Sequence, residues 1–383
     1  MSERSDSATR EGVSRKPSRQ VAVDALRGLI MIFMALDHAN HFVAHQHSPG
    51  EYWGGAFPVY YDPLAFVTRL VTHLAPAGFF LLMGVGMVSF AISRRERGWS
   101  HWAIVRHFLI RGTVLIALQL LLVNRAWELH PSGWGIEIYM GVLVALGGSM
   151  ILGSLLLRLK PRYLLALAVA LAVGAELLTP DPASWGQAYH PIVQTLLIPG
   201  GSPEFWVNYP VLQWLEMAVL GMIFGYWLAE DAGTAYRRAL MIGVTLIPVF
   251  VAVRYLDGFG NIRPRWGNGW MDFLNVVKYP PSIAYGLLTA GVNLTLLGLF
   301  GVISEKARRF LQVLATFGKT PLLFYVVHLF LYLGLGLVVA PRGTSIPVMY
   351  PFWLLGLVIL YPLCLWYGQL KRRQPVGSVL RFL

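Results

Sequence analysis

Apolar residues occur in long runs along the chain, separated by short polar segments. A helix that crosses a bilayer needs about 20 mostly apolar residues. Ten runs reach or approach that length, and we predict a membrane-spanning helix in each: 21–43, 72–92, 107–124, 136–157, 162–178, 210–229, 238–255, 282–303, 320–340 and 352–370. A short helix is predicted at the membrane interface near 305–318. The pattern therefore predicts an all-α polytopic membrane protein with about ten transmembrane helices.

The two ends of the chain differ in character from the apolar runs. Residues 1–20 are polar and basic, which is typical of a disordered tail, and residues 371–383 form a second basic tail. The first apolar run is too long for the core of a signal peptide, so we predict a retained helix. No 20–50-residue repeat and no Pro/Ser linker divides the remainder, and 21–370 is therefore predicted to be one transmembrane domain.

The composition supports this assignment and explains the charge. Hydrophobic residues make up 56% of the 383 residues and charged residues 13%, about half the share in soluble domains. The net charge of +12 fits either a nucleic-acid partner or a membrane. If both ends are cytoplasmic, 22 of the 31 basic residues fall on the cytoplasmic side, as the positive-inside rule requires. We therefore expect membrane lipids and no nucleic acid as partners, and a homodimer stays open.

The first predicted span contains ionisable residues, which are costly in lipid and usually functional. Asp24 and Arg27 are three residues apart and can pair on one face of a helix. His38 follows Arg27 by eleven residues, which places the two on the same face about 16 Å apart along the axis. A packing ion pair and an interface histidine would each explain one part of this pattern. Their common face, with Asp37 beside His38, favours a catalytic set made of Asp24, Arg27, Asp37 and His38.

Other polar residues lie at the ends of later spans or inside the ninth. We predict that they bind substrate: His73, Lys278, Tyr279, Lys319, Tyr325 and His328. His41 and His45 have the spacing of helical metal ligands, but no HExxH motif accompanies them, so no metal site is predicted. Haem would need facing histidines on two spans, and His38 and His328 are predicted at different depths. The single cysteine, Cys364, excludes an intrachain disulfide.

Glycines in two spans indicate where helices approach each other. Gly84 and Gly86 lie in the second predicted span, and Gly221 and Gly225 lie in the sixth. Small residues let helix backbones come close in a membrane. We therefore expect all four glycines to lie at helix contacts.

The stretch from Val23 to His38 resembles the opening of bacterial relatives of heparan-alpha-glucosaminide N-acetyltransferase, within the wider transmembrane acyltransferase superfamily. In its acyltransferase-three branch, an Arg followed by ten residues and a His on the first helix is the functional signature, and Arg27 and His38 have that spacing. The resemblance continues in residues 73–84, 273–282 and 317–328. In the animal lysosomal enzyme the catalytic His lies in the loop after the first helix. None of the histidines that follow His38 here is matched to it: His41, His45 and His47.

The resemblance implies transfer of an acyl group, in the first place acetyl, from cytoplasmic acetyl-CoA to a hydroxyl or amine of a glycan-type acceptor on the outer side. An arginine-rich cytoplasmic mouth would suit the donor phosphates, although the same residues also fit simple topology: Arg94, Arg95, Arg97, Arg106 and Arg111. Arg27 would hold the pantetheine arm or thioester, oriented by Asp24. His38 would act as general base or form an acyl-histidine, and Asp37 could orient it only where the backbone leaves regular helix geometry.

The resemblance leaves the acceptor and the choice between N- and O-acylation open. It implies a multi-pass protein of the bacterial inner membrane. The competing function is a transporter or export factor that uses the intramembrane polar stripe as a proton or substrate relay. The sequence shows no inverted repeat in its support.

Overall fold

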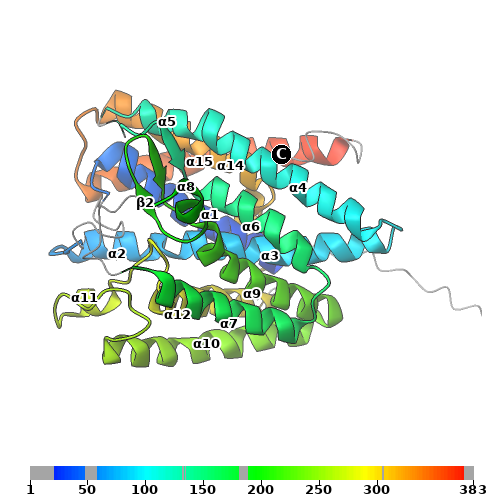
Figure 1. Cartoon of the computed structure of the whole chain (residues 1–383). Coiled ribbons are helices and arrows are strands. Elements are labelled where there is room, and N and C mark those ends of the chain that lie inside the picture. Colours follow the sequence, from blue (N-terminus) through cyan, green and yellow to red (C-terminus); the bar gives the residue numbers. More distant parts are fainter. Residues whose placement is uncertain are drawn as a thin grey trace, which may run out of the picture.

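Helices form nearly all of the computed structural model, which describes residues 21–47, 58–131, 133, 135–180, 189–303 and 306–374 (Figure 1). The α-helices are α1 (Val21–Ala39), α2 (Pro63–Thr72), α3 (Leu74–Arg95), α4 (His101–Leu118), α5 (Asn124–Glu128), α6 (Val142–Leu156), α7 (Pro161–Leu178), α8 (Pro191–Leu196), α9 (Val211–Glu230), α10 (Ala232–Leu256), α11 (Trp270–Leu274), α12 (Ile283–Val302), α13 (Arg308–Gly318), α14 (Pro321–Val339) and α15 (Ile346–Arg373). Two π-helical turns, η1 (Asn40–Ala44) and η3 (Gln119–Val123), continue α1 and α4. The predicted tail at 1–20 lies outside the described residues, as do residues 375–383 of the tail predicted at 371–383, whereas α15 continues to Arg373.

Eight segments of the described chain are long and apolar enough to cross a membrane: Pro63–Arg95, His101–Glu128, Pro161–Leu178, Val211–Glu230, Ala232–Leu256, Ile283–Val302, Pro321–Val339 and Ile346–Arg373. The other two predicted spans are also helices, but one carries too many charged residues and the other is too short to be counted with these eight. The first, α1, carries three charged residues, and α6 has only 15 residues. The all-α polytopic class is confirmed, and α13 lies where the short interface helix is predicted.

The helix ends follow local capping chemistry. Ser100 accepts a hydrogen bond from the Ala103 backbone N–H and starts α4 six residues before the predicted boundary. Ser282 caps α12 in the same way, because its hydroxyl accepts from the Tyr285 N–H. These side chains satisfy backbone groups that would otherwise lack a partner. The prediction of helix over 136–141 was wrong, because residues 138–140 form a strand.

One end of the bundle carries most of the irregular structure. A small sheet there has the order β1–β3–β2, made from β1 (Ile138–Met140), β2 (Gly200–Gly201) and β3 (Phe205–Val207). β1 and β3 are parallel, with Tyr139 opposite Trp206, and β2 is antiparallel to β3. The strands, α2 and α11 lie together at the left of Figure 1, and the turn from α3 to α4 lies at the opposite end.

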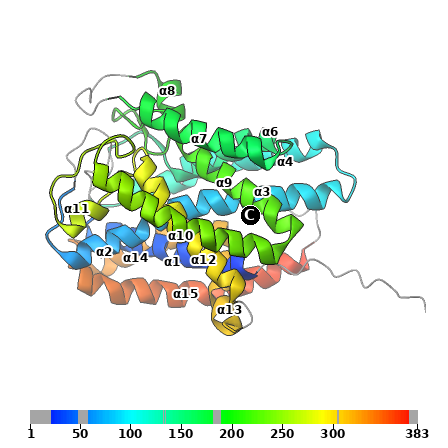
Figure 2. The same cartoon turned by 90° about the horizontal axis from the view of Figure 1, so that it is seen from below.

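The first helix lies inside the bundle rather than at its edge. It packs against α3, α12, α13 and α14, as Figure 2 shows from below. Around it, α10 packs along α12, α3 along α9, and α4 along α6. The polar residues of α1 are therefore surrounded by protein.

Glycines allow the close approach of α3 and α9. A Cβ atom on Gly84 would stand 1.9 Å from the Ala218 carbonyl oxygen, and one on Gly221 would stand 1.8 Å from that of Leu81. The expectation that Gly86 lies at a helix contact was wrong, because a Cβ atom added there would have no other atom within 4 Å. Gly86 lies away from the helix contact.

We expect Gly84→Ala to destabilise the protein by about 1–3 kcal/mol, since the new methyl group must push apart two packed backbones. Gly86→Ala is the matched control on the same helix, and it should be neutral or slightly stabilising because alanine favours helix. Thermal unfolding of both variants in detergent measures the difference. Equal melting temperatures would contradict the close α3–α9 contact.

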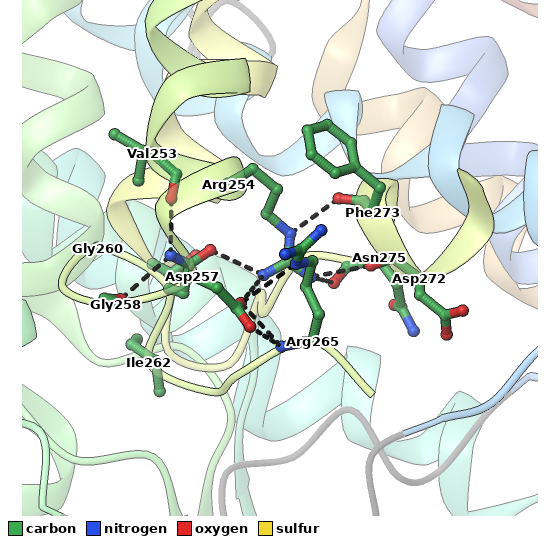
Figure 3. Close-up of polar contacts among 12 residues, drawn as sticks. Val253, Arg254, Asp257, Gly258, Gly260, Ile262, Arg265, Asp272, Phe273 and Asn275 are labelled. Atoms are coloured by element: carbon green, nitrogen blue, oxygen red, sulfur yellow. Dashed lines mark hydrogen bonds and ion pairs between the residues drawn. The ribbon is translucent and has the colours of Figure 1, made fainter. Parts of the chain in front are cut away.

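The loop between α10 and α12 is built around one buried arginine, Arg254, which is 1% exposed. Its guanidinium donates to the carbonyl oxygens of Phe273, Asp272 and Asn275 and to the side-chain oxygen of Asn261, over 2.7–3.0 Å (Figure 3). This loop leads directly into the residues before α12. Arg254 therefore fixes the position of one wall of the cavity described next.

Candidate functional site

A cavity of about 490 Å³ opens at the end of the bundle that carries the sheet. Its lining comes from both halves of the chain: Asp37, His38, His41, His45, His47, Gln119, Trp127, His130, Gly133, Tyr139, Val142, Asn208, Tyr209, Tyr279 and Tyr325. Imidazole, phenol and amide groups dominate this set. In the part of the chain that the structure describes, the lining contains no lysine or arginine.

The end of α1 brings the first histidines to the cavity. α1 keeps regular helix geometry through Ala39, and the π-helical turn η1 then carries His41. Wider π turns shift the side-chain positions and often occur at functional sites. His45 ends η1 in a left-handed conformation, with φ of 57°. One continuous segment therefore contributes four histidines to one wall.

His38 is held by a second histidine. Its Nδ1 lies 2.6 Å from Nε2 of His328 on α14. His328 is fully buried, whereas His38 is half-buried and lines the cavity. The Trp127 ring packs against His38 at an interplanar angle of 78°, with the ring centroids 5.5 Å apart. The expectation of different depths for His38 and His328 was wrong. Gly318, just before α14, contacts Arg27, so ten residues later His328 reaches the level of His38.

Asp37 does not contact His38, the partner that the sequence suggests. Its carboxylate accepts hydrogen bonds from the Arg69 guanidinium and from the Thr72 hydroxyl, the latter over 3.0 Å. Adjacent residues on a regular helix point about 100° apart, so the carboxylate does not reach His38. The described structure thus places Asp37 with α2, where it balances the buried charge of Arg69.

Further histidines cluster beside His38. The rings of His41 and His130 have centroids 4.8 Å apart, and those of His45 and His130 are 4.5 Å apart. Burial, followed by the nearby His45, lowers the pKa of His130 to about 4, so His130 is neutral at pH 7. Within the described ranges, no three His, Cys, Asp or Glu side chains are arranged to hold a metal ion.

The opposite wall is made of phenols and amides. The hydroxyls of Tyr209 and Tyr279 are 2.9 Å apart, and the Asn208 amide donates to the Tyr139 hydroxyl over 3.1 Å. Burial raises the pKa of both Tyr139 and Tyr209, so these phenols stay protonated at neutral pH. The side-chain oxygen of Asn208 is buried and has no hydrogen-bond partner among the described residues. It can accept a hydrogen bond from a bound hydroxyl or amine.

Sequence reasoning missed several lining residues, which lie in loops or at the ends of helices: Gln119, Trp127, His130, Tyr139, Asn208 and Tyr209. Aromatic residues in such outer loops are typical of membrane-interface anchors, and this common role concealed them. The only local signal is the polar pair Asn208-Tyr209 immediately before a predicted span.

The predicted substrate-binding residues lie in three places. Tyr279 and Tyr325 line the cavity, and the Lys278 amine lies 4.8 Å from the centre of the Tyr279 ring. His73 is buried behind this wall, where its backbone carbonyl accepts from the Tyr285 hydroxyl. Lys319 immediately follows α13, beside Arg27 rather than beside the cavity.

The other end of α1 carries the predicted ion pair. The Arg27 guanidinium donates to Asp24 over 2.8 Å, as the spacing predicts, and to the Gly318 carbonyl over 3.0 Å. Arg111 on α4 lies close enough to Arg27 for the two charges to repel. The two guanidinium groups therefore lie in the same region at this end, about 16 Å along α1 from His38.

The other four arginines of the predicted donor site have structural contacts or are exposed. Arg94 stacks over the rings of Phe90 and Trp99 at 4.8 and 5.1 Å. Arg95 donates to the Leu157 carbonyl over 2.9 Å. Arg97 and Arg106 are exposed. Arg111 therefore lies near Arg27, whereas the other four arginines have structural contacts or are exposed.

Comparison with known proteins adds one finding. The family model described as heparan-alpha-glucosaminide N-acetyltransferase, catalytic, matches residues 19–252. No individual curated protein matches the sequence. The family match spans more than half of the chain, including α1, the sheet and most of the cavity lining. The chain therefore belongs to the heparan-alpha-glucosaminide N-acetyltransferase catalytic-domain family, whose members are membrane acyltransferases.

Proposed function

We propose that this protein transfers an acetyl group from cytoplasmic acetyl-CoA to a hydroxyl or amine of a sugar on the outer side of the bacterial inner membrane. The observation that supports the proposal best is the position of His38, which lines the cavity and is held from behind by His328. A histidine placed in this way can remove the proton from an attacking hydroxyl or amine.

The chemistry of the cavity supports a sugar acceptor. Asn208, Gln119 and the four tyrosine phenols of the lining offer hydrogen-bond donors and acceptors, and Trp127 offers an aromatic ring. Pockets for small polar molecules combine apolar surfaces with a few placed polar groups. The absence of cationic side chains from the described lining favours a neutral or amine-bearing sugar over a sulfated one.

The reaction requires one bond to form and one to break at the thioester carbon. The acceptor oxygen or nitrogen bonds to the acetyl carbonyl carbon while its proton passes to His38. The carbon–sulfur bond then breaks, and the departing thiolate of coenzyme A takes up that proton. The products are the acetylated acceptor and coenzyme A.

The pair Arg27 and Arg111 supports a donor site at the other end of α1. Guanidinium groups bind phosphate through several hydrogen bonds at once. We expect Arg111→Gln to raise the KM for acetyl-CoA about tenfold, which corresponds to the loss of one charged hydrogen bond. Arg106→Gln, an exposed position on the same helix, is the control. An unchanged KM in Arg111→Gln would place the donor phosphates elsewhere.

Reconstitution into vesicles tests the proposed function. Radiolabelled acetyl-CoA is supplied outside, and glucosamine or glucose is trapped inside as an amine-bearing or a hydroxyl-only probe. Label should accumulate on a trapped sugar only when the protein is present. Movement of sugar across the membrane without any acetylation would favour the transporter, and the absence of label from both sugars and from a wider glycan panel would overturn the proposal.

A further inference from the structure

The surroundings of His328 restrict which nitrogen of each paired histidine carries a proton. Nδ1 of His328 lies 2.8 Å from the carbonyl oxygen of Phe324, one turn earlier on α14. A carbonyl oxygen can only accept a hydrogen bond. Nδ1 of His328 therefore carries a hydrogen.

The other nitrogen of His328 then faces Nδ1 of His38 at 2.6 Å. If that nitrogen also carried a hydrogen, His328 would be a cation. His328 is fully buried, and the rings against it belong to Phe324, Tyr325, Tyr332 and His38. None of these rings is negatively charged, and a buried cation without an anionic partner is strongly disfavoured. Nε2 of His328 therefore accepts, and Nδ1 of His38 donates.

We propose that His328 is a positioning residue that fixes His38 in the tautomer with a hydrogen on Nδ1 and a free lone pair on Nε2. This hydrogen-bonded chain runs from the Phe324 carbonyl through His328 to His38. Nε2 of His38 has no hydrogen-bond partner among the described residues and is left for the cavity. A catalytic base needs this arrangement, because the second ring nitrogen must be held by a partner that fixes the tautomer.

The hydrogen bonds from Phe324 through His328 to His38 have a consequence for acetyl transfer. This part of the inference rests on the proposed function. When Nε2 of His38 takes the proton of the acceptor, the ring becomes positive. Its hydrogen bond to His328 then becomes charge-assisted and stronger. His328 keeps its own hydrogen throughout, so no proton leaves the site by this route.

Nitrogen-15 NMR of the histidine-labelled protein in lipid tests the assignment directly. The resonances missing from His38→Gln identify His38. The wild-type ring should show a protonated Nδ1 and an unprotonated Nε2. A protonated Nε2 would overturn the proposal, whatever the activity of the protein.

Two variants of His328 separate positioning from packing. In His328→Gln the amide can still donate to Phe324 and accept from His38, so the tautomer and most of the activity should remain. In His328→Phe the acceptor is lost, and we expect the hydrogen to move to Nε2 and kcat to fall about 100-fold at an unchanged KM for acetyl-CoA. Equal kcat in the two variants would count against the assignment. Absence of acetyl transfer in the wild type would refute the proposed function instead, and the NMR result would stand on its own.

Discussion

His38→Ala should lower kcat for acetyl transfer by about 10²–10⁴-fold, the range typical of a lost general base. The substitution removes the only histidine that both lines the cavity and bonds to His328 in the described structure. The rate is measured with purified protein in lipid at saturating acetyl-CoA. Thermal unfolding of the same sample shows whether the variant is folded.

His190→Ala is a suitable control, because this histidine is exposed and lies outside the cavity lining. It should keep the wild-type rate. Rapid transfer by a folded His38→Ala protein would remove His38 from the mechanism. The same pair of variants also separates the two chemical routes. If an acyl-histidine forms on His38, radiolabelled acetyl-CoA should label the His190→Ala chain covalently at that position and leave it unlabelled in His38→Ala.

Arg254→Met should lower the stability of the protein by about 3–5 kcal/mol. Methionine matches the length of the arginine stem but leaves three backbone carbonyls and the Asn261 side chain without their donor. The loop from 257 to 281 should loosen first, because these acceptors hold it to α10. Melting temperature and the rate of proteolysis within this loop measure both effects.

Arg237→Met is the matched control, since Arg237 is exposed on the same helix. Arg254→Lys tests geometry separately from charge, because an ammonium group cannot reproduce the planar fork of the guanidinium. We expect the melting temperature of Arg254→Lys to lie between those of Arg254→Met and the wild type. A melting temperature of Arg254→Met equal to that of the control would show that the loop is held by other contacts.

Local patterns were sufficient to predict the helices and the contact between Asp24 and Arg27. Each depends on residues a few positions apart, and the i, i+3 spacing alone brings the carboxylate to the guanidinium. The short strand at 138–140 was not predictable in this way. Its pairing partner is 205–207, far along the chain, and the apolar run around it reads equally well as helix.

The partners of the site residues were harder to predict than the residues themselves. The sequence places Asp37 beside His38, yet the carboxylate contacts Arg69, which lies on another helix. His38 contacts His328 across 290 positions of sequence. Such contacts depend on how whole helices are rotated and shifted against one another, and no local spacing specifies that.

The pairing of α1 with α13 and α14 also limits how the protein can be divided. The family match ends at residue 252, whereas the Gly318 carbonyl and His328 lie well beyond it. A fragment ending at the family boundary would leave the Arg27 guanidinium without its backbone acceptor and His38 without the ring that holds it. A unit able to present the complete site must therefore extend from the first helix to at least α14.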